Sequence, residues 1–254
     1  MLKKRVIPVL LLRDGRMVKG VQFSDFRDTG NPRTAVRIYS AQDADELVFL
    51  DTQASLHSHQ ALLEIVRDAA AECFIPLAAG GGITTIEDVR ELLLAGADKV
   101  VVTTAAVTRP ALLTEIATRF GSQALVAGID YRQDPQGDAQ VWIRCGTERT
   151  DIEPVTHAMA LVALGAGEIL LNSIDRDGTM TGYDLEMAKA VANAVNVPVI
   201  ACGGAGNFMH LADLLNSTAV SGAACASIFH FGDNNPIRAR SYLRNLAIPM
   251  RVLK

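Results

Sequence analysis

Two pairs of similar segments recur in this sequence at one fixed spacing. ELVFLD at 46–51 aligns with EILLNS at 168–173, and IPLAAGGG at 75–82 aligns with VPVIACGG at 197–204. In both pairs the second copy begins 122 residues after the first, from 46 to 168 and from 75 to 197. Self-similarity at a fixed spacing indicates that one structural unit is used twice. The sequence therefore predicts two similar half-chains, at about 1–120 and 121–254.

Short apolar runs rich in β-branched residues alternate with helical patterns along the whole chain. The eight runs are 5–12, 46–51, 75–80, 99–103, 124–130, 168–174, 197–203 and 222–229. Near-continuous apolar strands of this kind are typical of parallel sheets that are covered on both faces. Four β/α units in each half predict one (β/α)8 TIM barrel domain over 1–254, a common size for this fold. A doubly wound open sheet is the competing interpretation.

Residues that favour the start or the end of a helix indicate where several helices begin and end. Thr84 and Glu87 have the spacing of a capping box before an apolar helical run, and Gly96 follows that run. Pro110 stands at the start of another helical pattern. The residues from 16 to 31 carry no helical pattern, and we expect them to form a long loop after the first strand.

Composition excludes several classes of protein. A formal net charge of −4 gives no general attraction to nucleic acid or to an anionic membrane. No apolar run reaches the length of about 18 residues that a membrane helix needs. The N-terminal run resembles a short signal peptide, but Pro8 interrupts it and no cleavage motif follows. The four cysteines (Cys73, Cys145, Cys202 and Cys225) show no metal-ligand spacing, so we expect a cytoplasmic protein without metal or cofactor.

In a (β/α)8 barrel the functional groups lie at the carboxyl ends of the strands. Asp130 ends the fifth apolar run and is the clearest candidate for a general acid or base. Asp51 ends the second run, and it either shares this chemistry or holds its loop. The same two interpretations apply to Asp175 and Asp177. Lys19 lies on the long loop and is either a catalytic cation or a solvated surface charge.

Each half contains a glycine-rich segment followed by a strand end that carries hydroxyl groups. AGGGITT at 79–85 precedes VVTTAA at 101–106, and ACGGAG at 201–206 precedes ACASIF at 224–229. Successive backbone N–H groups in such segments favour phosphate, although the glycines can also relieve crowding alone. Two such segments at one barrel mouth predict a ligand with two separated phosphate groups.

Charged residues begin four of the predicted strands: Arg5, Glu46, Lys99 and Glu168. The amino ends of the strands meet at the other end of a barrel, so these two cations and two anions are expected to face one another. A stabilising ring of salt bridges is the simpler interpretation, and a gate on a passage is the alternative.

Long motifs in this chain resemble one known family over nearly the whole length. They are DELVFLDTQAS, GGGITT, GADKV, TAAV, FGSQALVAGID, GAGEILLNSIDRDGT, GYD, ACGGAG and SIFHF. The family is the cyclase subunit of imidazole glycerol phosphate synthase. The resemblance implies a barrel that binds a glutaminase on its amino-terminal face as a heterodimer. Ammonia would pass through the barrel to a phosphorylated substrate at the opposite face.

The resemblance also assigns roles to residues. It implies an ammonia gate at the four strand-start charges, a glutaminase contact at Asp98 and Gln123, and a catalytic aspartate at Asp130. The implied phosphate ligands are Gly81, Gly82, Thr104, Asp177, Gly178, Gly203, Gly204, Ala226 and Ser227. Thr103 stands where the family has an asparagine at a phosphate.

One departure from the family concerns the reaction itself. Leu11 occupies the position of the second catalytic aspartate, and leucine can neither transfer a proton nor accept a hydrogen bond. Asn172 replaces a threonine, and Cys145 replaces a serine. An intact ammonia path with an altered reaction centre resembles a divergent branch of the family, associated with acetamidino sugars of bacterial surface polysaccharides.

Three functional hypotheses follow. The first is an ammonia-channelling synthase subunit that acts on a substrate other than that of the histidine pathway. The second is a genuine imidazole glycerol phosphate synthase cyclase with impaired or altered catalysis. The third is a non-catalytic scaffold or activator of a glutaminase, although retained phosphate sites argue against it.

Overall fold

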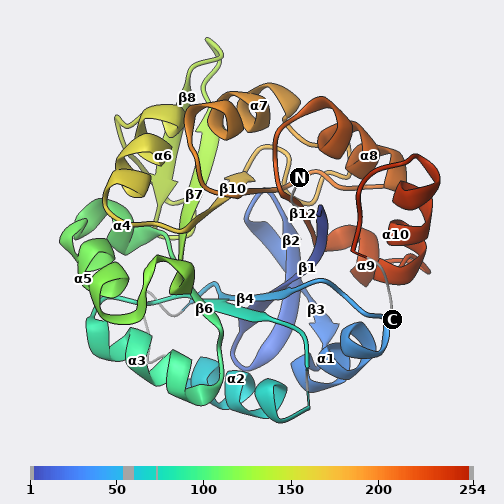
Figure 1. Ribbon diagram of the computed structural model, residues 1–254, viewed down its shortest axis with the longest axis horizontal. Coiled ribbons are helices and arrows are strands. Elements are labelled where there is room, and N and C mark those ends of the chain that lie inside the picture. Colours follow the sequence, from blue (N-terminus) through green and yellow to red (C-terminus); the bar gives the residue numbers. More distant parts are fainter. Residues whose placement is uncertain (1–2, 54–59, 73, 252–254) are drawn as a thin grey trace.

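A computed structural model describes residues 3–53, 60–72 and 74–251. Eight parallel strands close into a barrel, with helices around the outside (Figure 1). The barrel strands are, in order around the axis, β1 (Arg5–Arg13), β4 (Leu47–Asp51), β5 (Leu77–Gly80), β6 (Lys99–Val102), β7 (Leu125–Gln133), β10 (Glu168–Ser173), β11 (Val199–Cys202) and β12 (Gly222–Cys225). Because β12 pairs with β1, the eight barrel strands form a closed ring. The prediction of a (β/α)8 barrel is confirmed, and the open sheet is wrong.

Helices connect the strands and cover the barrel from outside (Figure 1). They are α1 (Pro32–Ala41), α2 (Gln60–Glu72), α3 (Ile86–Ala95), α4 (Thr104–Thr108), α5 (Ala111–Phe120), α6 (Pro154–Ala163), α7 (Leu185–Ala194), α8 (Phe208–Ser217), α9 (Ser227–His230) and α10 (Pro236–Asn245). Gly96 ends α3 in the left-handed conformation, as predicted. The capping box is shifted by one residue, because Thr85 and Asp88 make its reciprocal hydrogen bonds in place of Thr84 and Glu87.

The strands are buried on both faces, which explains their uninterrupted apolar character. Along β1, Val6, Leu10 and Leu12 pack outward against the helices. Ile7, Val9 and Leu11 point into the barrel, where they join inward residues of the other strands. The alternation has the two-residue period of a β-strand. One cluster therefore fixes the helices to the barrel, and the other fills the barrel interior.

Two sequence predictions about local structure are wrong, and one excursion was not predicted. The segment 16–31 forms a β-hairpin of β2 (Arg16–Val21) and β3 (Ser24–Gly30), which pairs with β1. The run 222–229 is a strand only as far as Cys225, because α9 begins at Ser227. A second excursion, β8 (Ala139–Ile143) and β9 (Glu148–Arg149), extends β7 beyond the barrel.

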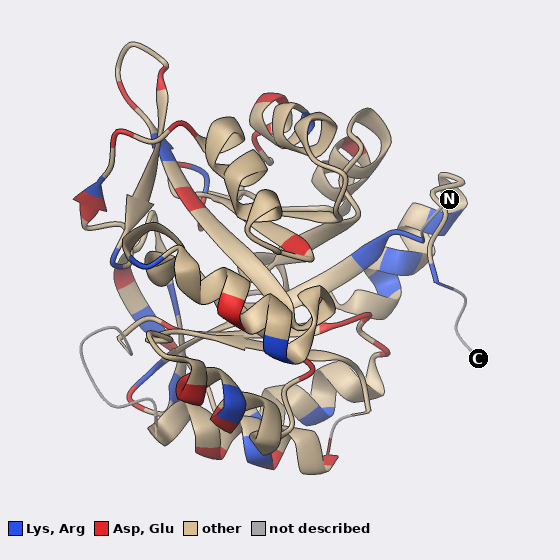
Figure 2. Cartoon of the chain, turned by 60° about the vertical axis from the view of Figure 1, so that its left-hand side comes forward, with Lys and Arg blue, Asp and Glu red and all other residues tan. Residues whose placement is uncertain are grey.

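At the amino-terminal side of the barrel, Lys4 pairs with Met250 in a short parallel bridge. Lys and Arg positions are frequent in the elements beside the N-terminus, and positions of both charge signs are mixed along the helices (Figure 2). Within the described residues, no helix has the length and apolarity needed to cross a membrane.

Candidate active site at the carboxyl end of the barrel

The last inward-pointing side chains of the strands form the mouth of the barrel. Asp130 belongs to β7 and Leu11 to β1, and these two strands lie opposite each other among the eight. Asn172 on β10 is beside Asp130 in register, and Leu50 on β4 is beside Leu11. The mouth therefore has a polar side and an apolar side.

Asp130 has the electrostatic properties of an acid or base that works near neutral pH. Burial is the main cause that raises the pKa of its carboxyl group to about 6, and the charge of Asp177 adds to the effect. A hydrogen bond of 3.0 Å from Asn172 Nδ2 to Asp130 Oδ1 acts in the opposite direction. A carboxyl group with such a pKa can change its protonation during a reaction.

Leu11 is part of the barrel core rather than of a polar site. Its side chain is 9% exposed and packs in the inner apolar cluster with Val9 and Val18. Phe26 from the hairpin and Leu50 also pack against this cluster. An aspartate at this position would place a carboxylate against apolar neighbours, where the charged form is disfavoured.

Lys19 is a buried cation held over the mouth by the hairpin. Its side chain is 2% exposed, and Nζ lies 2.8 Å from both carboxylate oxygens of Asp177. The alternative of a solvated surface lysine is therefore wrong. Gln22 at the hairpin tip donates through its backbone to Asp177 and through its side chain to the carbonyl of Asp175. These contacts hold the hairpin against the loop that follows β10.

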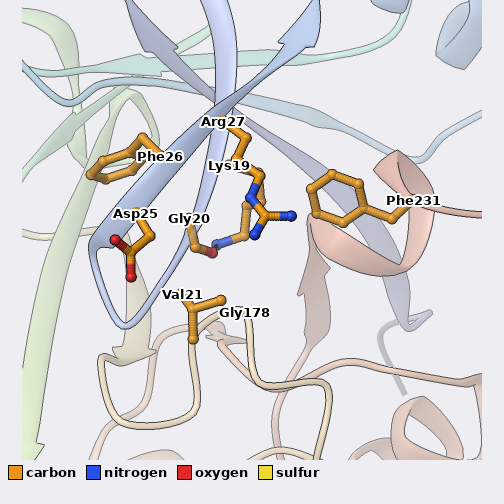
Figure 3. Close-up of a pocket in the computed structure, with 8 residues that line it drawn as sticks. All are labelled: Lys19, Gly20, Val21, Asp25, Phe26, Arg27, Gly178 and Phe231. Atoms are coloured by element: carbon orange, nitrogen blue, oxygen red, sulfur yellow. Dashed lines mark hydrogen bonds between the residues drawn. The ribbon is translucent and has the colours of Figure 1, made fainter.

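A cavity of about 500 Å³ opens between the hairpin, the loop at Gly178 and the segment after α9. The ring of Phe231 is turned toward the hairpin residues Lys19 and Arg27 in this cavity (Figure 3). Sequence reasoning named neither Arg27 nor Phe231. A basic and aromatic pattern in the hairpin sequence, FSDFR at 23–27, was the signal available. The cavity can hold an anionic ligand of small-molecule size.

The glycines of the predicted phosphate sites have backbones that only glycine adopts easily. Gly81 has φ of +117° and Gly203 has φ of +93°. A Cβ at Gly178 would collide with the backbone carbonyl of Gly20, so this glycine also permits the close approach of the hairpin. These constraints account for the glycines without a ligand, and phosphate binding there stays a prediction.

The hydroxyl-bearing residues of the predicted phosphate sites differ in the contacts that they make within the chain. Thr104 Oγ1 accepts a hydrogen bond from the backbone of Arg144, so the second hairpin uses this group. Thr103 precedes α4 and its Oγ1 lies close to Gly128. Ala226 and Ser227 stand at the start of α9, with Ser227 buried.

The other acidic residues and the cysteine near the mouth make local structural contacts. Asp51 Oδ1 accepts a hydrogen bond from the backbone of Gln53, and Asp175 Oδ2 accepts one from the backbone of Gln133. Cys145 lies on the turn between β8 and β9, and its Sγ is 2.9 Å from the carbonyl oxygen of Thr52. These hydrogen bonds fit the loop-holding interpretation of Asp51 and Asp175, and a part of either residue in the reaction stays a prediction.

The four strand-start charges form a closed ring at the floor of the barrel, hereafter the charge ring. Arg5 contacts Glu46 at 2.7 Å and also pairs with Glu168. Lys99 contacts Glu46 at 3.0 Å and Glu168 at 2.7 Å. Burial is the main cause that raises the pKa of Glu46. The expected meeting of these charges at one end of the barrel is confirmed.

Residues predicted to contact a partner lie on the amino-terminal face. Asp98 and Gln123 are exposed there, and Asp98 also accepts a hydrogen bond from the backbone of Leu77. Phe74 and Leu94 are exposed to 94% and 73%, and they lie just before β5 and in the last turn of α3. Chain direction places both on the same face as the charge ring.

The described residues contain no cluster of side chains suited to a metal ion. Cys202 and Cys225 are free thiols, and Cys73 lies outside the described residues.

A closed barrel with an ionisable group, glycine-rich loops and a cavity at its carboxyl end is the architecture of a (β/α)8 enzyme. Residues 5–235 match the model of the family described as histidine biosynthesis protein. The chain is 46% identical over 251 residues to imidazole glycerol phosphate synthase subunit HisF of Alkaliphilus metalliredigens (strain QYMF). This alignment covers 99% of the chain and 100% of the relative. The chain belongs to the histidine biosynthesis protein family and is an enzyme subunit of the HisF type.

Proposed function

We propose that this subunit receives ammonia at the floor of the barrel and uses it on a phosphorylated substrate at the mouth. The observation that carries the proposal is the alignment of two polar sites on one barrel axis. The charge ring closes the amino-terminal end, and Asp130 stands at the carboxyl end. Between them the interior is lined by apolar residues such as Val126 and Leu170. Neutral ammonia crosses such a lining more easily than an ion does.

The source of the ammonia is proposed to be a glutaminase subunit bound to the amino-terminal face, with Asp98 and Gln123 in the contact. The exposed side chains of Phe74 and Leu94 support this placement, because large apolar groups on a surface favour a protein interface. The relative's name, which calls it a subunit of a synthase, is consistent with a partner. We also propose that the assembly works in the cytoplasm, where thiols such as those of Cys202 and Cys225 stay reduced.

We propose that Asp130, Lys19 and Asp51 take part in the reaction. The proposed phosphate ligands are Gly81, Gly82, Thr103, Thr104, Asp177, Gly178, Gly203, Gly204, Ala226 and Ser227. Leu11 favours a substrate other than that of the histidine pathway, because no carboxylate faces Asp130 from β1. The proposed substrate is a phosphorylated sugar compound, such as a nucleotide sugar converted to an acetamidino sugar for surface polysaccharide.

A second candidate function is formation of imidazole glycerol phosphate in histidine biosynthesis. The full-length match at 46% identity to a HisF subunit favours it. The two glycine-rich loop pairs on opposite sides of the mouth favour it as well, because they suit a substrate with two phosphates.

A direct assay separates the two candidates. The purified chain is given ammonia at mildly alkaline pH with the bisphosphorylated histidine-pathway substrate, and imidazole glycerol phosphate is followed by mass spectrometry. We expect binding of the substrate without product from the wild-type chain. Product from the wild type, increased further by Leu11→Asp, would establish the second candidate instead. Absence of substrate binding would contradict the assignment of the phosphate sites in both.

A further inference from the structure

The repeat places two unlike pairs of side chains at equivalent positions of the barrel mouth. Asn172 lies at the position of Leu50 in the repeat, since ELVFLD aligns with EILLNS. Leu11 and Leu50 are neighbours in register on β1 and β4. Asp130 and Asn172 are neighbours in register on β7 and β10, the two strands diametrically opposite. One half of the molecule therefore contributes an apolar pair to the mouth, and the other contributes a polar pair.

The amide of Asn172 is oriented by the carboxylate beside it. Its Nδ2 donates to Asp130 Oδ1 over 3.0 Å, and this contact fixes which end of the amide faces Asp130. Its Oδ1 is buried and accepts no hydrogen bond within the described part of the chain. Buried carbonyl oxygens are nearly always paired in proteins, so an unpaired one beside an ionisable group calls for a ligand or a water molecule.

The residues around Asn172 Oδ1 leave a space next to this acceptor at the mouth of the barrel. A Cβ at Gly203, in the loop after β11, would come within 3.2 Å of Asn172 Oδ1, and glycine keeps that space open. The charge of Asp177, from the loop after β10, raises the pKa of Asp130. Cys202 lies beside Asn172 on β11, and burial raises the pKa of its thiol, which is therefore neutral where Asp130 titrates. Lys19 from β2 is paired with Asp177. The group that fills the space must therefore bring hydrogen-bond donors.

We propose that Asn172 is a positioning residue that orients Asp130 and, through Oδ1, binds an N–H or O–H group of the reacting molecule. Asp130 and Asn172 then form a binding site with two hydrogen-bond acceptors for ammonia, an amine or a hydroxyl group. The part of the substrate across the mouth meets Leu11 and Leu50, so it is apolar there. This inference rests on the proposed function. It limits the substrate to compounds that present hydrogen-bond donors to Asp130 and Asn172 and an apolar group to Leu11 and Leu50.

The positioning role is testable without turnover. The carboxyl carbon of Asp130 is titrated by ¹³C NMR in the full-length wild type, in Asn172→Leu and in Asn172→Thr, with Asp130→Asn for assignment. Loss of the Nδ2 donor is expected to raise the pKa of Asp130 by about one unit in Asn172→Leu. Threonine restores a donor, so Asn172→Thr is expected to stay close to the wild type. Cys202→Ala is the matched control, because Cys202 is beside Asn172 in register on β11, and it should leave the pKa of Asp130 unchanged.

A titration of Asp130 that is unchanged in Asn172→Leu would overturn the positioning role. The acceptor role has its own readout, the KM for ammonia in ammonia-fed turnover of whichever substrate the direct assay establishes. We expect Asn172→Leu to raise this KM about tenfold, while circular dichroism shows an intact fold. Unchanged KM values for both ammonia and the phosphorylated substrate would overturn the acceptor role alone. If no turnover is found with any phosphorylated substrate, the proposed function fails, and the NMR titration still decides the role of Asn172.

Discussion

Asp130 is an acid placed where its charged form is costly. Burial raises the pKa of its carboxyl group to about 6, and one side-chain hydrogen bond from Asn172 offsets part of that effect. A group raised above its unfolded value stabilises the fold below the unfolded pKa and loses that contribution as pH rises through the folded pKa. For Asp130 the loss falls between about pH 4, its ordinary range, and pH 6.

The variant Asp130→Asn is therefore expected to unfold at a higher temperature than the wild type at pH 8 and at a similar temperature at pH 4. An increase of a few degrees corresponds to about 1 kcal/mol for a domain of this size. Calorimetry at the two pH values measures the difference.

The same substitution is expected to abolish product formation while leaving the glutaminase activity of an assembled complex intact. Full product formation by the variant would support the scaffold hypothesis.

At the scale of elements, the hairpin β2–β3 pairs with β1 and is also fixed over the mouth by one buried ion pair. Lys19 on β2 and Asp177 after β10 contact each other at 2.8 Å, and both are nearly inaccessible to solvent. Removing one partner of a buried pair leaves a charge without compensation, at a cost of about 3–5 kcal/mol. We therefore expect the pair to add to the stability that the hairpin gains from its pairing with β1 and from the hydrogen bonds of Gln22.

Lys19→Met is expected to destabilise the chain by about 3 kcal/mol and to increase amide hydrogen exchange throughout the hairpin. Urea unfolding and exchange mass spectrometry measure the two effects. Arg16→Met is the matched control on the same strand, because the Arg16–Asp28 pair is half exposed. Surface pairs contribute about 0–1 kcal/mol, so this control should change little. Equal effects of the two variants would show that the hairpin does not depend on the buried pair.

At the scale of the whole molecule, the two ends of the barrel carry different chemistry on one axis. The charge ring closes the floor with alternating signs, and Lys99 contributes two of its four contacts. A passage controlled by this ring is needed only for ammonia that enters from the amino-terminal face. Ammonia supplied in the medium reaches the mouth directly.

Lys99→Ala is therefore expected to lower glutamine-dependent turnover of the complex severalfold more than turnover fed by free ammonia. Both rates are measured on the same assembled complex. Arg109→Ala removes a cation that pairs with Glu115 on the exposed surface, and it is expected to change neither rate. A proportional loss of both rates in Lys99→Ala would indicate a structural ring instead of a passage.

Much of the site followed from strand order alone. Strand ends follow from apolar runs, and the barrel brings their carboxyl ends to one face. Asp130 and the four residues of the charge ring were predicted for this reason. Lys19 was harder to predict, because a single lysine in an irregular segment carries no periodic signal. Arg27 and Phe231 were missed, since the cavity that joins them depends on how the hairpin folds back over the mouth.

The sequence by itself determined the barrel and the ends of the strands that carry the candidate site, and it predicts two similar halves. Hydrophobic periodicity and a fixed repeat are local properties, and they are sufficient for that result. Only the tertiary structure decided that Lys19 is buried against Asp177 and that an unpaired oxygen of Asn172 lies beside Asp130. Burial, pairing and pKa depend on contacts between residues more than 40 positions apart, which no local pattern encodes.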